Sequence, residues 1–122
     1  MTAKTRLCDL TELSQPGSKG FTIEDGAESW NIFVVRKNGK VYGYWNACPH
    51  TGTPLDWLPD QFLDADEELI MCSTHGAEFR IEDGFCVSGP CENQRLLALS
   101  VLVEDGVVYV DDEFLRAPEE QL

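Results

Sequence analysis

The sequence predicts an all-β protein, an antiparallel β-sandwich with a loop-rich subdomain, and three observations support this fold class. Apolar and polar residues alternate with a period of two along much of the chain, as they do in half-buried strands. Turn signals that contain glycine recur between these runs, and no convincing amphipathic helix is present. With 122 residues and 43% hydrophobic content, the chain can bury the core of one compact domain.

The clearest hairpin is predicted over residues 30–45. The runs Trp30 to Lys37 and Lys40 to Trp45 flank the dipeptide Asn38-Gly39. Both residues of this dipeptide accept the positive φ angles of a type I′ turn, which is a favoured connection between antiparallel strands. We therefore expect two neighbouring strands joined by a two-residue turn.

The tripeptide Glu-Asp-Gly predicts further turns. Its copies begin at Glu24, Glu82 and Glu104, and each follows a β-branched or aromatic run. A second such run comes after the copies at Glu82 and Glu104, so we expect hairpins with glycine at the strained position. The copies are 58 and then 22 residues apart, which is too irregular for a stacked repeat and indicates recurrent turn chemistry.

Between Ala47 and Leu69 the strand pattern stops, because three prolines and Gly52 interrupt it. We predict one domain over residues 1–122. Residues 1–45 and 92–122 are expected to form a β body, and residues 46–91 a loop-rich lobe. The lobe contains both histidines of the chain.

The charge and the hydropathy pattern exclude several classes of partner. A formal net charge of −13 argues against nucleic acid, which requires a basic surface, and against anionic membranes. No apolar run approaches the ~20 residues that a membrane-spanning helix needs. The first residues contain no signal-peptide core, so we expect a cytoplasmic protein whose five cysteines are mostly reduced.

The candidate metal ligands form two pairs, and 21 residues separate the second ligand of the first pair from the first ligand of the second. The four candidates are Cys48, His50, Cys72 and His75. Two thiolates and two imidazoles suit a closed tetrahedral zinc site. They equally suit a 2Fe–2S cluster with both cysteines on one iron and both histidines on the other. The alternative without a metal is two buried thiols and two surface histidines.

The run Cys48 to Leu55 has the form C-x-H-x-G-x-P-L, and the run Cys72 to Gly76 has the form C-x-x-H-G. In this order, the two runs resemble the ligand motifs of the Rieske iron–sulfur family. Downstream residues that fit the family pattern are Phe79, Gly84 and the dipeptide Gly89-Pro90, which resembles the loop that covers the cluster. The resemblance extends over roughly residues 20–112.

The resemblance implies one Rieske-type 2Fe–2S cluster. Cys48 and Cys72 are expected to bind the inner iron, and His50 and His75 the outer iron on the solvent side. Such centres have higher reduction potentials than all-cysteine clusters, about −150 to +300 mV against about −400 mV.

The residues around the predicted ligands place this centre near the low end of that range. Thr53 and Thr74 stand where high-potential relatives carry an extra disulfide, and Ala77 stands where they carry a serine. Fewer hydrogen-bond donors to the cluster sulfurs stabilise the reduced charge less. We therefore expect a low-potential centre, on the order of −150 mV.

The resemblance implies electron transfer and no catalysis by this chain alone. The predicted protein is a small Rieske-type ferredoxin of a multicomponent oxygenase, which passes one electron from a reductase to a terminal oxygenase or another acceptor. Oxygenase subunits need a second iron held by two histidines and a carboxylate, and no histidine remains for it. The chain also lacks a glycine-rich dinucleotide fingerprint. The alternatives are a small subunit of a larger reductase, such as nitrite reductase, and a zinc-stabilised interaction module.

Two further groups of residues have more than one interpretation. Cys86 and Cys91 form a disulfide, a redox pair or two reduced thiols, and the last is favoured in the cytosol. The acidic stretch from Asp60 to Glu68 is a solvated loop or a surface that steers a basic redox partner.

Overall fold

The computed structural model describes residues 4–14, 16–25, 28–47, 55–56, 58, 60–72, 76–89 and 94–111. Within these ranges the one helix is a short 3-10 turn at Leu10–Glu12, and the other regular elements are antiparallel strands. The predicted all-β fold class is confirmed. The same ranges include no helix with the length and apolar character that a membrane crossing requires.

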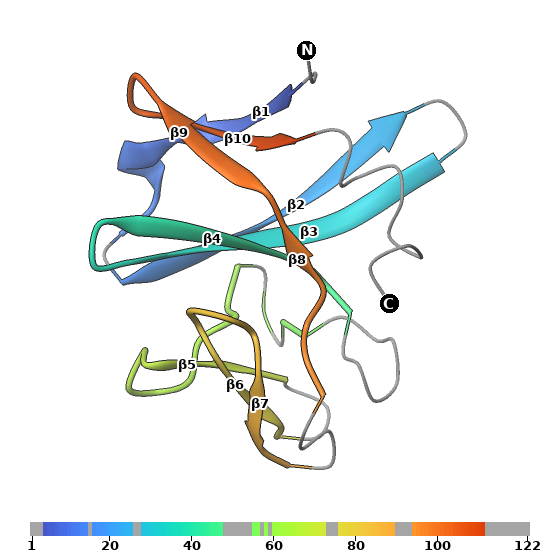
Figure 1. Cartoon of the computed structure of the whole chain (residues 1–122), viewed down its shortest axis with the longest axis vertical. Coiled ribbons are helices and arrows are strands. Elements are labelled where there is room, and N and C mark those ends of the chain that lie inside the picture. The colour runs from blue at the N-terminus through green and yellow to red at the C-terminus, as the bar shows by residue number, and fades with distance from the viewer. Residues whose placement is uncertain are drawn as a thin grey trace.

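Three antiparallel sheets are stacked along the molecule (Figure 1). The central sheet has the order β2-β3-β4-β8 and consists of β2 (Gly17–Asp25), β3 (Glu28–Lys37), β4 (Lys40–Trp45) and β8 (Ala98–Leu99). The outer sheet has the order β1-β10-β9 and consists of β1 (Lys4–Asp9), β10 (Val107–Asp111) and β9 (Val101–Glu104). The lobe sheet has the order β5-β6-β7 and consists of β5 (Leu69–Met71), β6 (Glu78–Arg80) and β7 (Cys86–Ser88).

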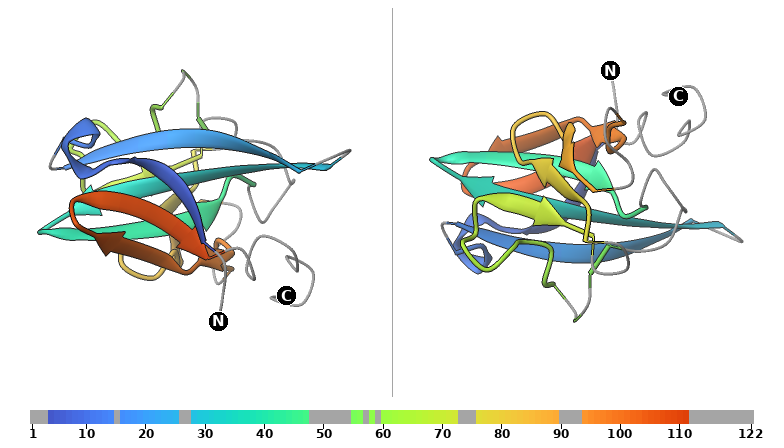
Figure 2. Two further views of the ribbon diagram at one scale, coloured as in Figure 1. Left: turned by 90° about the horizontal axis from the view of Figure 1, so that it is seen from above. Right: turned by 90° about the horizontal axis from the view of Figure 1, so that it is seen from below.

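The outer sheet lies on one side of the central sheet and the lobe sheet on the other, as the views from above and below show (Figure 2). The chain passes from the central sheet to the outer sheet between β8 and β9, at Ser100. The Ser100 carbonyl accepts a hydrogen bond from Asp111 N–H at 3.0 Å, so the crossing is fixed to the end of β10.

Strand β3 is buried on both faces, because its apolar run from Ile32 to Val35 alternates between two sides of the central sheet. Ile32 and Val34 belong to clusters shared with β10, whereas Phe33 and Val35 belong to the core shared with the lobe. All four side chains are 0% exposed. A continuous apolar run is typical of a strand that is covered on both sides.

The turn predictions are confirmed where the structure describes the turns. Asn38 and Gly39 have φ angles of 53° and 79° and join β3 to β4. Asp105 and Gly106 have φ angles of 51° and 75° and join β9 to β10 in the same way. Gly84 has a φ of 72° in the connection between β6 and β7. Strands β2 and β3 pair as an antiparallel hairpin around the copy of the tripeptide at Glu24, and Gly26 of that copy lies outside the described residues.

Contacts from the central sheet hold the lobe in place. Phe33 of β3 stacks on Phe62 with the two ring centroids 4.2 Å apart. The Ser18 hydroxyl of β2 donates to the Asp60 carbonyl at 2.7 Å, and Gly20 N–H donates to Asp60 Oδ1 at 2.8 Å. The acidic stretch thus begins with a residue that satisfies the backbone of an edge strand.

One apolar core fills the space between the central sheet and the lobe sheet. We call this cluster the lobe core, and it consists of Phe33, Val35, Tyr44, Leu55, Phe62, Ile70, Cys72, Ala77, Phe79, Ile81, Cys86 and Leu96. The division into a body of residues 1–45 and 92–122 and a lobe of residues 46–91 stays a prediction.

Candidate metal centre

The second ligand motif forms the connection between β5 and β6. Cys72 directly follows β5, and Ala77 directly precedes β6. Cys72 N–H donates to the Ala77 carbonyl at 2.8 Å, and Gly76 N–H donates to the Cys72 carbonyl at 2.8 Å. Gly76 has a φ of 69°, in the left-handed region that glycine adopts most readily. These bonds fix both ends of the motif, while residues 73–75 lie outside the described part of the chain.

Cys72 lies in the lobe core and is 0% exposed. Leu55, the last residue of the first ligand motif, is also 0% exposed and belongs to the same core. One described end of each motif is therefore anchored in a single apolar cluster. This placement fits the expected donor set, because a cysteine that binds the inner iron needs a site protected from solvent.

The other three predicted ligands, Cys48, His50 and His75, lie outside the described residues. In the ranges that the structure describes, no three His, Cys, Asp or Glu side chains are grouped so that they could hold a metal ion. The set of four ligands stays a prediction, with Cys72 as its described member.

The segment after β7 packs against the second ligand motif. Gly89 has a φ of 103°, and a Cβ atom added there would lie 2.6 Å from Ala77 Cα and 3.0 Å from Ala77 Cβ. Only glycine permits this close approach. Gly89 belongs to the predicted covering loop, and its backbone touches the residue that follows the motif. Pro90 lies outside the described residues.

The first ligand motif is bordered by a side-chain bridge that the sequence did not reveal. Asn46 Nδ2 donates to Asp56 Oδ1 at 3.0 Å, and Leu55 N–H donates to Asn46 Oδ1 at 2.7 Å. Asn46 follows β4, and Leu55 ends the motif. Asparagine is known to bond to nearby backbone N–H groups, which is the one sequence signal that could have identified this bridge.

The acidic stretch contains structural carboxylates as well as exposed ones. Asp64 Oδ1 accepts hydrogen bonds from Glu68 N–H at 3.0 Å and Leu69 N–H at 3.3 Å, which closes the turn before β5. Asp66, Glu67 and Glu68 are exposed. Two acidic residues, Asp60 and Asp64, thus have a role in folding that accounts for their position.

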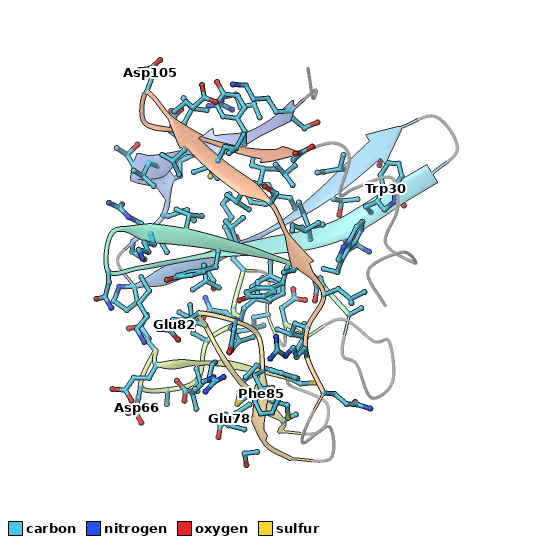
Figure 3. All side chains as sticks on the ribbon, in the orientation of Figure 1. Trp30, Asp66, Glu78, Glu82, Phe85 and Asp105 are labelled. Carbon is cyan, nitrogen blue, oxygen red and sulfur yellow. The ribbon has the colours of Figure 1, made fainter. Side chains whose placement is uncertain are left out.

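The Glu78 carboxyl lies near this stretch (Figure 3). Partial burial raises the pKa of Glu78, and a hydrogen bond with Asp64 and the charges of Asp64 and Asp66 raise it further. In Figure 3, Asp66, Glu78, Glu82 and Phe85 gather on the lobe, whereas Trp30 and Asp105 lie on the body. Three of the four residues labelled there are acidic.

Two guanidinium groups flank the Phe85 ring on the lobe. Arg80 and Arg95 lie 5.3 and 5.5 Å from its centroid. Arg80 is also paired with Asp83, and Asp83 Oδ1 accepts a hydrogen bond from Phe85 N–H at 3.0 Å. The hydrogen bond from Arg80 and then that from Phe85 lower the pKa of the Asp83 carboxyl.

One residue of the cysteine pair has a described position. The Cys86 thiol is buried and donates to the Ser88 carbonyl at 3.2 Å. Cys91 lies outside the described residues, so the state of this pair stays a prediction. Trp45 packs with Ile32 and Val110 in the cluster between the central and outer sheets, away from the lobe core.

Comparison with known proteins agrees with this geometry. The family model described as the Rieske [2Fe-2S] domain matches residues 3–112. The chain belongs to the Rieske 2Fe–2S domain family. This membership confirms the resemblance and the cofactor that the two ligand motifs predicted, a Rieske-type cluster, in preference to a structural zinc site.

Solved Rieske structures share the fold over most of the chain. The ferredoxin of carbazole 1,9a-dioxygenase from Nocardioides aromaticivorans IC177 is 26% identical with a TM-score of 0.71, over 89% of this chain and 97% of that chain. The ferredoxin of Sphingomonas yanoikuyae B1 is 25% identical with a TM-score of 0.67, over 89% and 98% of the two chains.

A structure described as the complex of reduced oxygenase and oxidized ferredoxin in carbazole 1,9a-dioxygenase shares the fold with 22% identity and a TM-score of 0.70. The match covers 91% of this chain and 94% of that chain. No curated protein matches the chain closely enough to count as a relative.

Proposed function

We propose that this protein is a one-electron carrier, the ferredoxin component of a multicomponent oxygenase. It accepts an electron from a reductase and delivers it to a terminal oxygenase or another acceptor. The observation that carries this proposal is the likeness to two ferredoxins over 97% and 98% of their own length. The match extends over nearly the whole of each ferredoxin, so this chain contains the entire fold that those carriers use.

The proposed ligands divide into two pairs with different tasks. Cys48 and Cys72 hold the inner iron, and the complete burial of Cys72 in the lobe core supports this assignment. His50 and His75 hold the outer iron and present their ring edges to a redox partner. The cluster, when bound, takes up and releases one electron. Neutral imidazoles in place of two thiolates reduce the negative charge of the site, which favours the reduced state.

The proposal includes one Rieske domain over residues 1–122 with the lobe at residues 46–91 as its cluster-binding part. It also includes a cytoplasmic location. A reducing compartment of this kind would keep the ligand thiols available for iron. We expect no binding to nucleic acid or to anionic membranes, because the formal net charge of −13 would repel both.

The ligand assignment is tested with three buried cysteines. Cys72→Ala, Cys8→Ala and Cys86→Ala each remove a thiol from a side chain that is at most 1% exposed. We expect only Cys72→Ala to abolish the visible absorption and the rhombic EPR signal of the reduced protein. Equal loss in all three variants, or colour in Cys72→Ala, would contradict the assignment.

Electron transfer is tested in the wild-type protein and in His50→Ala and His75→Ala. The protein is reduced with dithionite and mixed with oxidised cytochrome c as a one-electron acceptor. We expect one electron per chain from the wild type and none from either variant. A wild-type protein that is colourless, or that transfers no electron, would overturn the proposed function.

A further inference from the structure

Asn46 directly follows β4 and stands two residues before Cys48, the first residue of the first ligand motif. Its backbone N–H donates to the Asn31 carbonyl of β3 at 2.9 Å, so the residue is fixed to the central sheet. Its side-chain amide then spans the base of the motif. The Nδ2 atom donates to Asp56 Oδ1 at 3.0 Å, and the Oδ1 atom accepts from Leu55 N–H at 2.7 Å.

The two ends that this amide joins are anchored in different parts of the fold. The Asn46 end continues β4 of the central sheet, and the Leu55 end is buried in the lobe core. The chain between them carries Cys48 and His50. The bridge therefore sets the separation between the start and the end of the segment that holds two of the four predicted ligands.

The chemistry of the bridge explains why asparagine stands at this position. One amide group donates with its nitrogen and accepts with its oxygen, and Asn46 uses both functions at once. An aspartate could accept from Leu55 N–H but would face the Asp56 carboxylate with a second negative charge. An alanine could make neither bond.

We propose that Asn46, with Asp56 as its partner, is a positioning residue for the metal centre. The bridge ties the residue that follows β4 to the residue that ends the first ligand motif, which restrains the segment that carries Cys48 and His50. Metal sites depend on such supporting bonds, because ligands that are held loosely bind and tune the metal less well. This inference rests on the proposed function, since it assumes that the motif binds the cluster.

The bridge lies at a partly solvated site, where a substitution should not prevent folding. Asn46 and Asp56 are half-buried and line an open cavity of about 470 Å³ together with Thr22 and Asn31. Water can reach the groups that lose a partner when the bridge is removed. A variant at Asn46 should therefore fold, while the ligand segment loses its restraint.

The first test compares Asn46→Ala with Ser18→Ala. The Ser18 hydroxyl donates to the Asp60 carbonyl and accepts from Phe62 N–H at 3.3 Å, so this control also loses two partly buried hydrogen bonds. Its bonds hold the neighbouring loop and not the ligand motif. Cluster loss is followed by the decay of visible absorption in the presence of an iron chelator, and EPR spectra and thermal unfolding are recorded for each loaded protein.

We expect Asn46→Ala to lose the cluster about tenfold faster than the wild type, and Ser18→Ala to stay within about twofold. The EPR signal of Asn46→Ala should broaden or shift, because the ligand geometry becomes variable. A role in folding alone would lower the unfolding temperature of both variants and leave the EPR signal unchanged. That pattern would overturn the inference.

A second test exchanges the two partners. Asn46→Asp places two carboxylates side by side and should accelerate cluster loss at least as much as Asn46→Ala. Adding Asp56→Asn restores a donor opposite an acceptor and the original net charge, so the double variant should return to within about threefold of the wild type. Asp56→Asn alone keeps an acceptor for Asn46 and should have the smaller effect.

The double variant tests the positioning role of the bridge even if Asn46→Ala fails to fold. Cluster loss that is as fast in the double variant as in Asn46→Asp would show that the pairing has no role, and the inference would be wrong. A wild-type protein without a Rieske EPR signal contradicts the proposed function instead. A normal wild type with unaffected Asn46 variants contradicts only this inference.

Discussion

Tyr44 of β4 donates its hydroxyl proton to the carbonyl of Ile81 at 2.6 Å, across the boundary between the central sheet and the lobe. The two residues are 2% and 0% exposed. The bond satisfies a backbone carbonyl in the lobe core with a side chain from a different sheet. Burial raises the pKa of Tyr44 well above its usual range, and the nearby charge of Asp83 raises it further.

Tyr44→Phe should lower the free energy of unfolding by about 1–3 kcal/mol, because the Ile81 carbonyl loses its buried partner. The ring itself is retained, so the packing of the lobe core changes little. Urea unfolding of the loaded protein measures the effect, with Tyr42→Phe on the same strand as the matched control. A loss no larger than that of the control would show that the bond contributes nothing.

The same variant has a predicted pH dependence. The unfolded chain releases the Tyr44 proton at about pH 10, whereas the folded protein retains it to higher pH. The folded state then binds more protons than the unfolded state, so the wild-type stability falls as pH rises above about 10. Tyr44→Phe has no hydroxyl proton at this position and therefore lacks this pH-dependent loss of stability. The stability gap between the two proteins should therefore narrow between pH 10 and pH 11, and a constant gap would contradict the assignment.

Gly84→Ala should destabilise the protein more than Gly106→Ala. Both glycines have positive φ angles, 72° and 75°, so both substitutions incur the backbone cost of about 1–2 kcal/mol. Only at Gly84 does the new Cβ meet other atoms, 2.8 Å from Tyr44 Cε1 and 3.2 Å from Leu96 Cβ. We expect an additional loss of about 1–3 kcal/mol there, measured by urea unfolding. Equal losses of stability in the two variants would show that the lobe core accommodates the added methyl group at Gly84 without further destabilisation.

The local features of the fold were predictable from the sequence because they depend on neighbouring residues. Asn38-Gly39 and Asp105-Gly106 specify their turns through backbone angles that these residues accept. The cysteine and histidine pairs are likewise short motifs, which can be recognised from a few neighbouring residues. The run from Ile32 to Val35 predicted a strand, but only the structure shows that the strand is covered on both faces.

The contacts that join the lobe to the body were not predictable in this way. Tyr44 bonds to a residue 37 positions away, and the side chain of Asp60 bonds to a residue 40 positions away. Neither a tyrosine nor an aspartate indicates from its type alone which distant residue it will contact. The composition of the acidic stretch is that of a solvated loop and gave no sign of the bonds that Asp60 makes. The bridge at Asn46 spans a shorter interval but depends on the path of the ligand segment, which a turn rule does not specify.

Glu78→Gln should stabilise the protein at neutral pH by about 0.5 kcal/mol, a size typical of partly exposed charges. The raised pKa of Glu78 means that the folded state binds its proton more strongly than the unfolded state does. Stability therefore falls as pH rises through the folded pKa, and the variant removes this penalty. The gain should disappear below about pH 4. Glu24→Gln on the body makes the same charge change, and an equal gain there would indicate a general charge effect.

Gly89→Ala should weaken retention of the cluster. The added Cβ would lie 2.6 Å from Ala77 Cα, and the φ of 103° is unfavourable for alanine. The segment after β7 must then move away from the second ligand motif, which opens that side of the site to water. We expect visible absorption to decay several-fold faster in air than in Gly106→Ala, whose Cβ meets no atom within 4 Å. Equal decay in both variants would show that the contact between Gly89 and Ala77 does not protect the cluster.

The reduction potential should lie near the bottom of the Rieske range, at about −150 mV. Ala77 supplies no side-chain donor at the position after Gly76, and its neighbour Gly89 supplies none either. Because donors to the cluster sulfurs stabilise the extra negative charge of the reduced state, their absence lowers the potential. A spectroscopic redox titration of the purified protein measures the midpoint. A clearly positive value would show that groups other than the side chain at position 77 determine the charge balance of the centre.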